Sequence, residues 1–419
     1  MIMNRQYDVV VIGAGPAGLL AAGKAAMEGA RVLVLEKMEK PARKLRITGK
    51  GRCNITNLKP LDEFLAEIKP EPRFLRDAFG EFFSNDIIEL IESQGVGVVV
   101  ERGQRAFPTS GKAWDVAEAL IRWAKGLGVS IVCHATVTAI NLTNNSISFV
   151  AYKANGEHLV QCESVVLATG GKSYPATGST GEGFLLAEKC GHRITPLRPT
   201  LVGLETSPVY DTASGLLLKN VNLSVFVDGK KISQEFGELE NMPYGLGGAI
   251  ALRVSREVVG FLDDGRDVEL EIDFKPALNH EKIDKRLLRE IDGNPKMGMI
   301  DLARKLLPKQ LAEIMLDELG IAFQKIVSRT SSDDRKLIRL WLKEKRFSVT
   351  GYRPWNEAIA TAGGVSLKEV NPHTMESKLV KGLYFGGEVL DLDGATGGFN
   401  LQIAYSTGWL AGKSAAATR

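Results

Sequence analysis

The 419-residue sequence has few cysteines and few histidines, and each shortage excludes a class of site. Its four cysteines, Cys53, Cys133, Cys162 and Cys190, are widely scattered and form no Cys-x-x-Cys pair. This spacing excludes a zinc ribbon and a dithiol redox centre, and it favours a reducing, cytoplasmic setting. The five histidines form no cluster with metal-ligand spacing, so we expect no metal site.

Long hydrophobic runs and a strong net charge are also missing. No apolar run approaches the roughly 20 residues that a membrane span needs, so we expect no membrane segment. A strand is predicted at the N-terminus itself, which leaves no room for a signal peptide. The net charge is +3, too small to favour nucleic acid or an anionic membrane as the main partner. The length predicts two or three globular domains.

Glycine, in contrast, is abundant, with 44 residues, and one rich stretch follows a predicted strand near the N-terminus. The strand Tyr7–Ile12 leads into Gly13–Gly18, which matches G-x-G-x-x-G and opens a predicted helix, Pro16–Met27. The three glycines of this motif permit a tight turn, a close approach to a pyrophosphate and close helix–strand packing. A second strand ends at Glu36, at about the spacing that binds an adenosine ribose. An acid there disfavours a 2′-phosphate, so we expect a dinucleotide other than NADP.

A similar device lies near the C-terminus, where the strand Gly382–Glu388 is followed by Gly397–Asn400 and a predicted helix, Leu401–Ala411. A helix start can stabilise negative charge on a reduced flavin ring, a feature that a nicotinamide does not need. The loop Lys44–Asn57 is too long and too rich in donors for a plain connection. The strand Ser164–Gly171 ends in a glycine pair that allows close backbone approach. Together these segments predict FAD rather than NAD.

These motifs resemble those of the bacterial aminoacetone-oxidase-like FAD-binding family, which also contains a flavin-dependent reductase of bile-acid enones. The resemblance covers most of the chain, and its specific parts are Ile47–Asn57, Gly387–Asp391 and Gly397–Gln402. It implies an α/β fold: a Rossmann-like FAD-binding domain with a small antiparallel sheet, interrupted by a family-specific insert. The implied cofactor-binding residues are Gly13, Ala14, Gly15, Pro16, Ala17, Gly18, Glu36, Lys37, Lys44, Gly49, Gly51, Arg52, Cys53, Asn54, Val137, Ala168, Thr169, Gly170, Gly387, Glu388, Gly398, Asn400, Leu401 and Gln402.

The chain departs from the family pattern at two places. Many relatives carry three glycines before Arg52-Cys53-Asn54, whereas Lys50 replaces the middle one here. Around Met242–Ala249, many relatives carry a Thr-His and a Ser-Gly-Pro that this sequence lacks. These departures concern the substrate more than the cofactor.

The chain is expected to contain an FAD-binding domain in two parts, 1–195 and 351–419, around an insert at 196–350. The insert is β-rich over 196–277, with one helix expected at Leu246–Val259, and helical over 278–347. The helical part should break at Gly293-Asn294-Pro295, Pro308 and Gly320. It has 16 Lys and Arg against 11 Asp and Glu, a net charge of +5. That charge indicates either a solvated surface or a basic binding face.

The electron donor and the catalytic residues are less sharply defined. No second G-x-G-x-x-G follows a strand, and Gly178–Gly183 has its glycines in another order. NAD(P)H would therefore visit the flavin transiently rather than occupy a domain of its own. Arg52 is a candidate to hold an anionic or carbonyl substrate, and Cys53 is a candidate to cover the ring or simply to pack. Tyr174, which precedes a proline, is either a proton donor to the product or a structural residue.

Three functions remain open from the sequence. The first is a bacterial NAD(P)H-linked, FAD-dependent reductase of an unsaturated or carbonyl small molecule. The second is an oxidase of a small, aminoacetone-like amine that passes electrons to oxygen. The third is a flavoprotein that docks RNA or a protein through the basic helical insert, although nucleic acid is the less expected partner.

Overall fold

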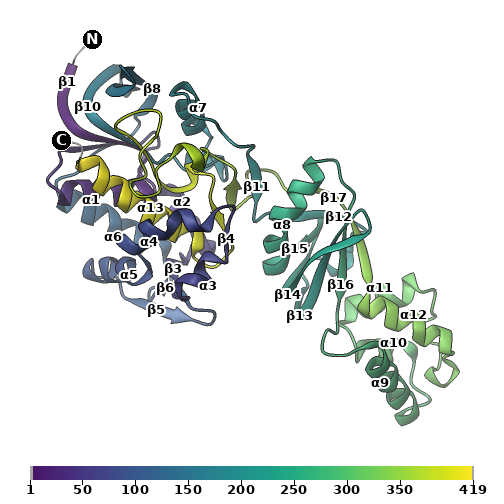
Figure 1. The fold of residues 1–419 in the computed structure, drawn as a ribbon. Helices are drawn as coiled ribbons and strands as arrows, with labels where there is room; N and C mark the ends of the chain where they lie inside the picture. Colours follow the sequence, from purple (N-terminus) through teal and green to yellow (C-terminus); the bar gives the residue numbers. More distant parts are fainter. Residues whose placement is uncertain (1–2, 418–419) are drawn as a thin grey trace. The chain divides into compact units, whose positions relative to one another are not determined.

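The computed structural model describes residues 3–417, with side chains described from Tyr7 onward. The chain divides into two compact units. Unit 1 contains the residues up to Pro199 together with those from Trp355 onward, and unit 2 contains Thr200–Pro354. Each unit has its own hydrophobic core. In Figure 1, purple, blue and yellow segments combine in unit 1, so the two ends of the chain build one unit and the middle builds the other.

Unit 1 is built on a mixed sheet with the strand order β7-β2-β1-β10-β9-β8 and with β19 beside β10. β1, β2, β7, β10 and β19 pair in parallel, whereas β8, β9 and the first part of β10 pair antiparallel. Val9–Val11 and Val32–Leu35 are buried apolar runs, as expected for parallel strands covered on both faces. The predicted Rossmann-like α/β fold with a small antiparallel sheet is confirmed. The strands are β1 (Met3–Ile12), β2 (Val32–Leu35), β7 (Ser130–Val132), β8 (Thr136–Thr143), β9 (Ser146–Lys153), β10 (Glu157–Leu167) and β19 (Leu383–Phe385).

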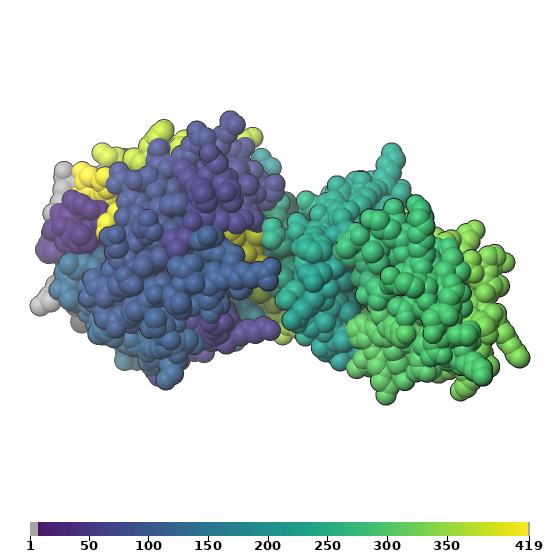
Figure 2. All heavy atoms as spheres, turned by 90° about the horizontal axis from the view of Figure 1, so that it is seen from below, coloured from purple at the N-terminus to yellow at the C-terminus, as the bar shows by residue number. Residues whose placement is uncertain are grey.

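The first and last helices of unit 1, α1 (Pro16–Met27) and α13 (Phe399–Ala416), pack against each other through small residues. A Cβ added at Gly408 would lie 2.2 Å from the backbone oxygen of Ala17. A Cβ added at Gly412 would lie 2.1 Å from that of Ala21. The two helices approach this closely because the glycines have no side chain. Purple and yellow segments accordingly lie side by side in both views (Figures 1 and 2).

Shorter elements complete the description of unit 1. β3, β6 and β5 form a small antiparallel sheet, and β4 pairs with β20. Two short strands, β11 and β18, lie near the points where the chain leaves and re-enters unit 1. The helices are α2 (Arg43–Ile47), α3 (Leu61–Leu65), α4 (Arg76–Glu81), α5 (Ser84–Ser93), α6 (Ala113–Gly126) and α7 (Glu182–Lys189). The strands are β3 (Thr56–Asn57), β4 (Ile68–Lys69), β5 (Val98–Glu101), β6 (Arg105–Pro108), β11 (Arg198–Thr200), β18 (Ala360–Ala362) and β20 (Asp393–Gly394).

Unit 2 begins with a closed barrel of six strands in the order β12-β15-β14-β13-β16-β17. The strands are β12 (Leu204–Ser207), β13 (Leu217–Val227), β14 (Lys230–Met242), β15 (Gly245–Gly247), β16 (Val268–Asp273) and β17 (Lys345–Tyr352). The helix α8 (Gly248–Asp263) packs on β14. The expected bounds of this helix, Leu246–Val259, were wrong because Gly245–Gly247 pairs with β12 and β14 as a strand.

The helical part of unit 2 lies between β16 and β17. It contains α9 (His280–Gly293), α10 (Met299–Arg304), α11 (Lys309–Glu318) and α12 (Ser332–Lys343), with the predicted breaks between them. Asn279 begins α9 because its side chain accepts a hydrogen bond from the Lys282 N–H. Ser331 and Asp334 begin α12 with a capping box. The buried face of these helices supplies part of the second core.

Candidate cofactor and active site

Four loops of unit 1 meet at one edge of its sheet. Ile12, at the end of β1, lies opposite Leu167 of β10 and Leu35 of β2. Leu167 in turn lies opposite Phe385, at the end of β19. The loops that leave these strands begin at Gly13, Glu36, Ala168 and Gly386. Ligands of open α/β sheets bind at such carboxyl ends of parallel strands.

The first loop has the geometry that its glycine pattern predicts. Gly13 has φ +100°, and a Cβ there would lie 2.6 Å from the Ala168 backbone oxygen. A Cβ on Gly18 would lie 1.9 Å from the Gly13 oxygen, so only glycine allows this packing of strand and helix. A Cβ on Gly15, by contrast, would meet nothing within 4 Å. The backbone at Gly15 is therefore open to a group such as a pyrophosphate, at the start of α1.

Glu36 lies at the neighbouring strand end with its carboxylate held by backbone donors. The N–H of Ala14 donates to Oε2 at 2.8 Å, and the N–H of Met38 donates to Oε1 at 2.9 Å. Burial raises the pKa of this carboxyl above its usual value, although these hydrogen bonds act in the opposite direction. Each oxygen retains a lone pair that can accept from a ribose hydroxyl.

Two other predicted residues lie around Glu36. Lys37 Nζ donates to Thr180 Oγ1 at 2.6 Å and forms an ion pair with Glu182 at 2.9 Å. Val137 lies in β8, two residues after Ala135, whose N–H donates to the backbone oxygen of Glu36 at 2.8 Å. The fold thus brings both residues to the Glu36 end of the site.

The loop after α2 is a run of left-handed backbone. Gly49, Lys50, Gly51 and Cys53 have φ of +58°, +56°, +84° and +58°. A Cβ on Gly51 would meet nothing within 4 Å. The N–H groups of Arg52 and Cys53 donate to the backbone oxygens of Gly49 and Thr48, at 3.2 and 3.0 Å, so the loop holds its own shape while its backbone at Gly51 is open to a ligand. The loop therefore fits the phosphate and ribityl part of an extended cofactor.

The side chains in this loop have different roles. The Arg52 guanidinium stacks on the Phe107 ring at 4.4 Å and pairs with Glu101. Cys53 is fully buried, and burial raises the pKa of its thiol to about 12. A protonated thiol is a poor nucleophile at neutral pH, so this environment favours the packing interpretation of Cys53.

Two buried polar atoms at this edge have no hydrogen-bond partner among residues 3–417. They are Oδ1 of Asn54 and Oγ1 of Thr169, both from predicted cofactor-binding loops. Buried polar atoms in proteins are normally paired, so these two oxygens lack a partner that a bound polar group could supply. Together with the open backbone at Gly15, they show that the residues present fit an extended dinucleotide.

Glu388 is the centre of a polar cluster drawn from four segments. Lys44 Nζ donates to Glu388 Oε2 at 2.7 Å and to Ser173 Oγ at 2.6 Å. Ser173 Oγ lies 3.0 Å from Glu388 Oε1, which also accepts from the Thr361 N–H at 2.8 Å. The N–H of Gly171 donates to Oε2 at 3.3 Å. Lys44 and Glu388 were expected from the sequence, whereas Ser173 and Thr361 were not.

The glycine-rich turn near the C-terminus, Gly397–Asn400, lies beside β3. Gly398 has φ +100°, and a Cβ there would lie 2.5 Å from the Thr56 carbonyl carbon. The Asn400 side chain binds the backbone of Gly394 through two hydrogen bonds, of 2.8 and 2.7 Å. Gln402 is fully buried and accepts from Thr56 Oγ1 at 2.6 Å. These amide side chains thus hold the loop, which leaves the backbone at the start of α13, including Leu401, as the candidate cofactor contact.

Tyr174 directly follows the Glu388 cluster. Its φ is +51°, uncommon for a bulky residue, and its N–H donates to the Trp355 oxygen at 3.0 Å. Among the described residues, no contact joins Tyr174 to Arg52, so the structure does not combine these two candidates. Ser173 and Thr361 were missed in the prediction from the sequence, and no local motif marks either residue.

Neither a metal centre nor a membrane span is found in the described part of the chain. Residues 3–417 contain no group of three or more His, Cys, Asp or Glu placed to hold a metal ion. None of the described helices is long and apolar enough to cross a membrane.

Comparison with known proteins decides the family. A family profile described as the HI0933-like protein Rossmann domain matches residues 7–414. The chain belongs to the HI0933-like family. This HI0933-like protein is an FAD-dependent oxidoreductase. The expected resemblance to a bile-acid-enone reductase is also confirmed.

The relatives match this HI0933-like chain over nearly its whole length. A 3-dehydro-bile acid delta(4,6)-reductase of Clostridium scindens is 30% identical, over 99% of both chains. A ribosomal RNA dihydrouridine synthase of Haemophilus influenzae is 28% identical, over 97% of this chain and 98% of the relative. Another of Escherichia coli is 28% identical, over 96% of both chains.

Solved structures share the fold at lower identity. A 3-ketosteroid-delta4-(5alpha)-dehydrogenase from Rhodococcus jostii aligns with a TM-score of 0.54 and 17% identity, over 99% of this chain and 98% of that one. A flavocytochrome c3 fumarate reductase aligns with a TM-score of 0.51 and 17% identity, over 99% of this chain and 79% of that one.

Proposed function

We propose that this HI0933-like protein reduces a carbon–carbon double bond conjugated with a carbonyl, using NAD(P)H as the electron donor. One observation carries this proposal. Two kinds of relative with very different substrates, a bile acid and a ribosomal RNA, are named for the same change of bond. A 3-dehydro-bile acid with a delta-4 double bond is an enone, and dihydrouridine is uridine reduced at the ring double bond beside a carbonyl. The two kinds of relative therefore share the type of double bond that is reduced, and they differ in the substrate molecule that carries it.

The residues of unit 1 are arranged to hold FAD for this reaction. The open backbone at Gly15 would receive the pyrophosphate, and Glu36 would receive the adenosine ribose. The loop Gly49–Asn54 and Thr169 would line the middle of the cofactor, and the start of α13 would face the pyrimidine edge of the ring. The chemistry that FAD would supply at this site is hydride transfer to one carbon of the double bond.

The chain must then supply a proton to the neighbouring carbon. Tyr174 is our candidate, because its backbone is fixed beside Ser173 and its phenol is a proton donor. Lys44 offsets the charge of Glu388, so the cluster beside Tyr174 does not repel an electron-rich substrate. NAD(P)H has no glycine-rich unit of its own here, since Gly178–Gly183 leads into the first residues of α7 without a strand directly before it. We therefore propose that NAD(P)H binds transiently. We also propose that the protein acts in the cytoplasm.

An anaerobic experiment tests this function. We expect the purified yellow protein to bleach with NADH or NADPH, and the yellow colour to return on adding a 3-oxo-delta-4 steroid or a uridine-containing RNA. Tyr174→Phe should bleach normally but reoxidise with the unsaturated substrate about 10²–10⁴-fold more slowly, the usual contribution of a general acid. Tyr152→Phe in β9 is the matched control. Bleaching by aminoacetone but by neither nicotinamide would establish the oxidase function instead.

A second candidate substrate class is uridine within RNA. It is favoured by the two relatives named ribosomal RNA dihydrouridine synthase and by the charge of +5 over residues 278–347. The bond chemistry is the same as for an enone small molecule. The two candidates differ in what must be recognised outside the reacting ring.

A further inference from the structure

The exposed face of α9 carries an uneven distribution of charge. Lys282, Lys285 and Arg289 follow each other at spacings of three and four residues, so they lie on one side of the helix. The buried side contains Ile283 and Leu287. All three basic residues are exposed. We call these three residues, with Lys296 and Arg329, the α9 basic stripe.

Lys296 and Arg329 extend the line beyond the end of α9. The Val327 N–H donates to the Met297 oxygen at 2.9 Å, and the Ser328 N–H donates to the Pro295 oxygen at 3.2 Å. These bonds hold the segment with Arg329 beside the segment with Lys296, and both side chains are exposed. The α9 basic stripe therefore runs from the first turn of α9 past its last residue, over roughly 20 Å.

The acidic residues of α9 do not neutralise the stripe. Asp284 pairs with Arg335 and Arg339 of α12, and Glu290 pairs with Lys305. Within residues 3–417, Lys282, Arg289, Lys296 and Arg329 have no acidic partner, whereas Lys285 pairs with Glu281. The unpaired acid on this face is Asp292. The five basic residues of the stripe, counted together with Glu281 and Asp292, therefore have a net charge of about +3.

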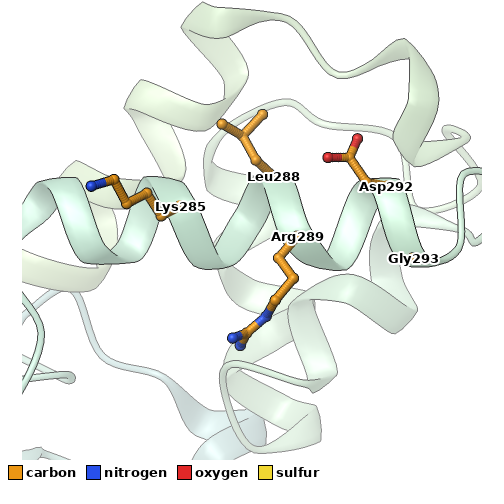
Figure 3. Close-up of a pocket in the computed structure, with 5 residues that line it drawn as sticks. All are labelled: Lys285, Leu288, Arg289, Asp292 and Gly293. Carbon is orange, nitrogen blue, oxygen red and sulfur yellow. The ribbon is translucent and has the colours of Figure 1, made fainter.

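The exposed side of α9 also has a hollow, part of which lies away from the α9 basic stripe. A shallow hollow of about 600 Å³ is lined by Lys285, Leu288, Arg289, Asp292 and Gly293, all from α9. Figure 3 shows Arg289 extending to the opposite side of the helix from Leu288 and Asp292. The green atoms of this part of unit 2 lie at the surface in the space-filling view (Figure 2). The hollow is shallow and formed by one helix, so it does not enclose a small molecule.

We propose that the α9 basic stripe docks the phosphate backbone of RNA. Unpaired, exposed Lys and Arg in a row are the usual contacts to phosphates, which position a nucleic acid without reading its sequence. The stripe has no aromatic residue, which argues for backbone contacts rather than base stacking. The choice of RNA as the partner rests on the proposed function, in which uridine within RNA is the second candidate substrate class. The docking itself does not depend on the flavin chemistry.

The test measures binding of a fluorescein-labelled stem–loop RNA to the full-length flavoprotein by anisotropy at several salt concentrations. We expect the logarithm of affinity to fall linearly with the logarithm of salt. The triple variant Lys282→Gln, Lys285→Gln, Arg289→Gln should bind more weakly, and its slope should fall by about one for each phosphate that the variant no longer neutralises. The control is Lys219→Gln, Lys230→Gln, Lys231→Gln, which removes the same charge from β13 and β14.

Each outcome decides the proposal. It stands if the slope falls for the α9 variant and is unchanged for the control. It fails if the slope falls equally for both variants, because that result shows only diffuse attraction, or if it falls for neither. It also fails if polyglutamate binds the stripe with the same slope, which would indicate an acidic protein partner. Reduction of a steroid enone should be equal in both variants, so a failure of the enzyme function is seen separately.

Discussion

Lys50 has a left-handed backbone conformation, which is energetically costly for a residue with a side chain. Its φ of +56° is left-handed, and it is exposed between Gly49 and Gly51. A side chain in this region costs roughly 1–2 kcal/mol, whereas glycine adopts it freely. Many members of the family carry glycine at this position, where this chain has a lysine in a conformation that glycine adopts freely.

We predict that Lys50→Gly stabilises unit 1. The relief of strain outweighs the larger conformational entropy of glycine in the unfolded chain, by up to about 1 kcal/mol. Lys50→Ala, which removes the amine but retains the strain, is the control and should change stability little. Denaturant unfolding of the flavin-free protein measures both variants, and an alanine variant as stable as the glycine variant would contradict the argument.

Residue-level prediction of the site is best founded where the signal is local. Gly13, Gly15 and Gly18 act within one turn, so their spacing alone indicates which must be open and which must be packed. Ser173 and Thr361 could not be found in this way. Their role exists only because the fold joins Lys44 to Ser173, 129 residues away, and to Glu388, 344 residues away.

At the level of elements, the close contact between α1 and α13 depends on Gly408 and Gly412. We predict that Gly408→Ala lowers the stability of unit 1 by about 1–3 kcal/mol, because the new methyl meets the rigid backbone of α1. The displaced helix begins at the Gly13–Gly18 turn, so FAD should also be released at a lower temperature. Melting followed by flavin fluorescence measures both effects.

The matched control for this prediction is Gly126→Ala at the end of α6. An added Cβ at Gly126 meets nothing within 4 Å, so alanine there should be neutral or slightly stabilising through its helix propensity. If the two substitutions had equal effects, the interhelical contact would not be the cause.

Element prediction was accurate for α1, whose bounds, Pro16–Met27, were those expected. It was wrong for α13, expected at Leu401–Ala411 and found at Phe399–Ala416. Periodicity failed there because α13 is buried almost all round, so it has no polar face to mark its limits. Closure of the barrel in unit 2 was not predicted either, since alternation reveals strands but not their partners.

For the molecule as a whole, the two cores should unfold as two transitions. Glu318 joins the parts of unit 2: it accepts from Tyr210 at 2.7 Å, Trp341 at 2.6 Å and Lys345 at 2.8 Å. We predict that Glu318→Gln lowers the free energy of unfolding of unit 2 by about 1–2 kcal/mol and leaves the FAD content unchanged. Calorimetry separates the transitions. Glu313→Gln on the same helix, which removes an exposed pair with Arg304, should change stability by less than about 0.5 kcal/mol.

The effect of Glu318→Gln should depend on pH with a defined sign. Burial alone would raise the pKa of Glu318, but the hydrogen bonds from Lys345, Trp341 and Tyr210 outweigh it and lower the pKa. Stability from a lowered carboxyl pKa is fully present above the unfolded value, about 4.3 for glutamate, and is lost as pH falls through the folded value. The wild type and the variant should therefore converge in acid.

The packing of α1 on α13 also sets an order of assembly during synthesis. Thr200–Pro354 is one continuous stretch, so it can mature on the ribosome while the remaining residues are still being made. The nucleotide-binding unit must wait, because Gly408 and Gly412, against which its first helix packs, are translated after the whole of Thr200–Pro354. Until then, the apolar surface around Val9–Val11 is without its cover, and a message truncated before Gly408 would yield a folded insert on an unfinished oxidoreductase.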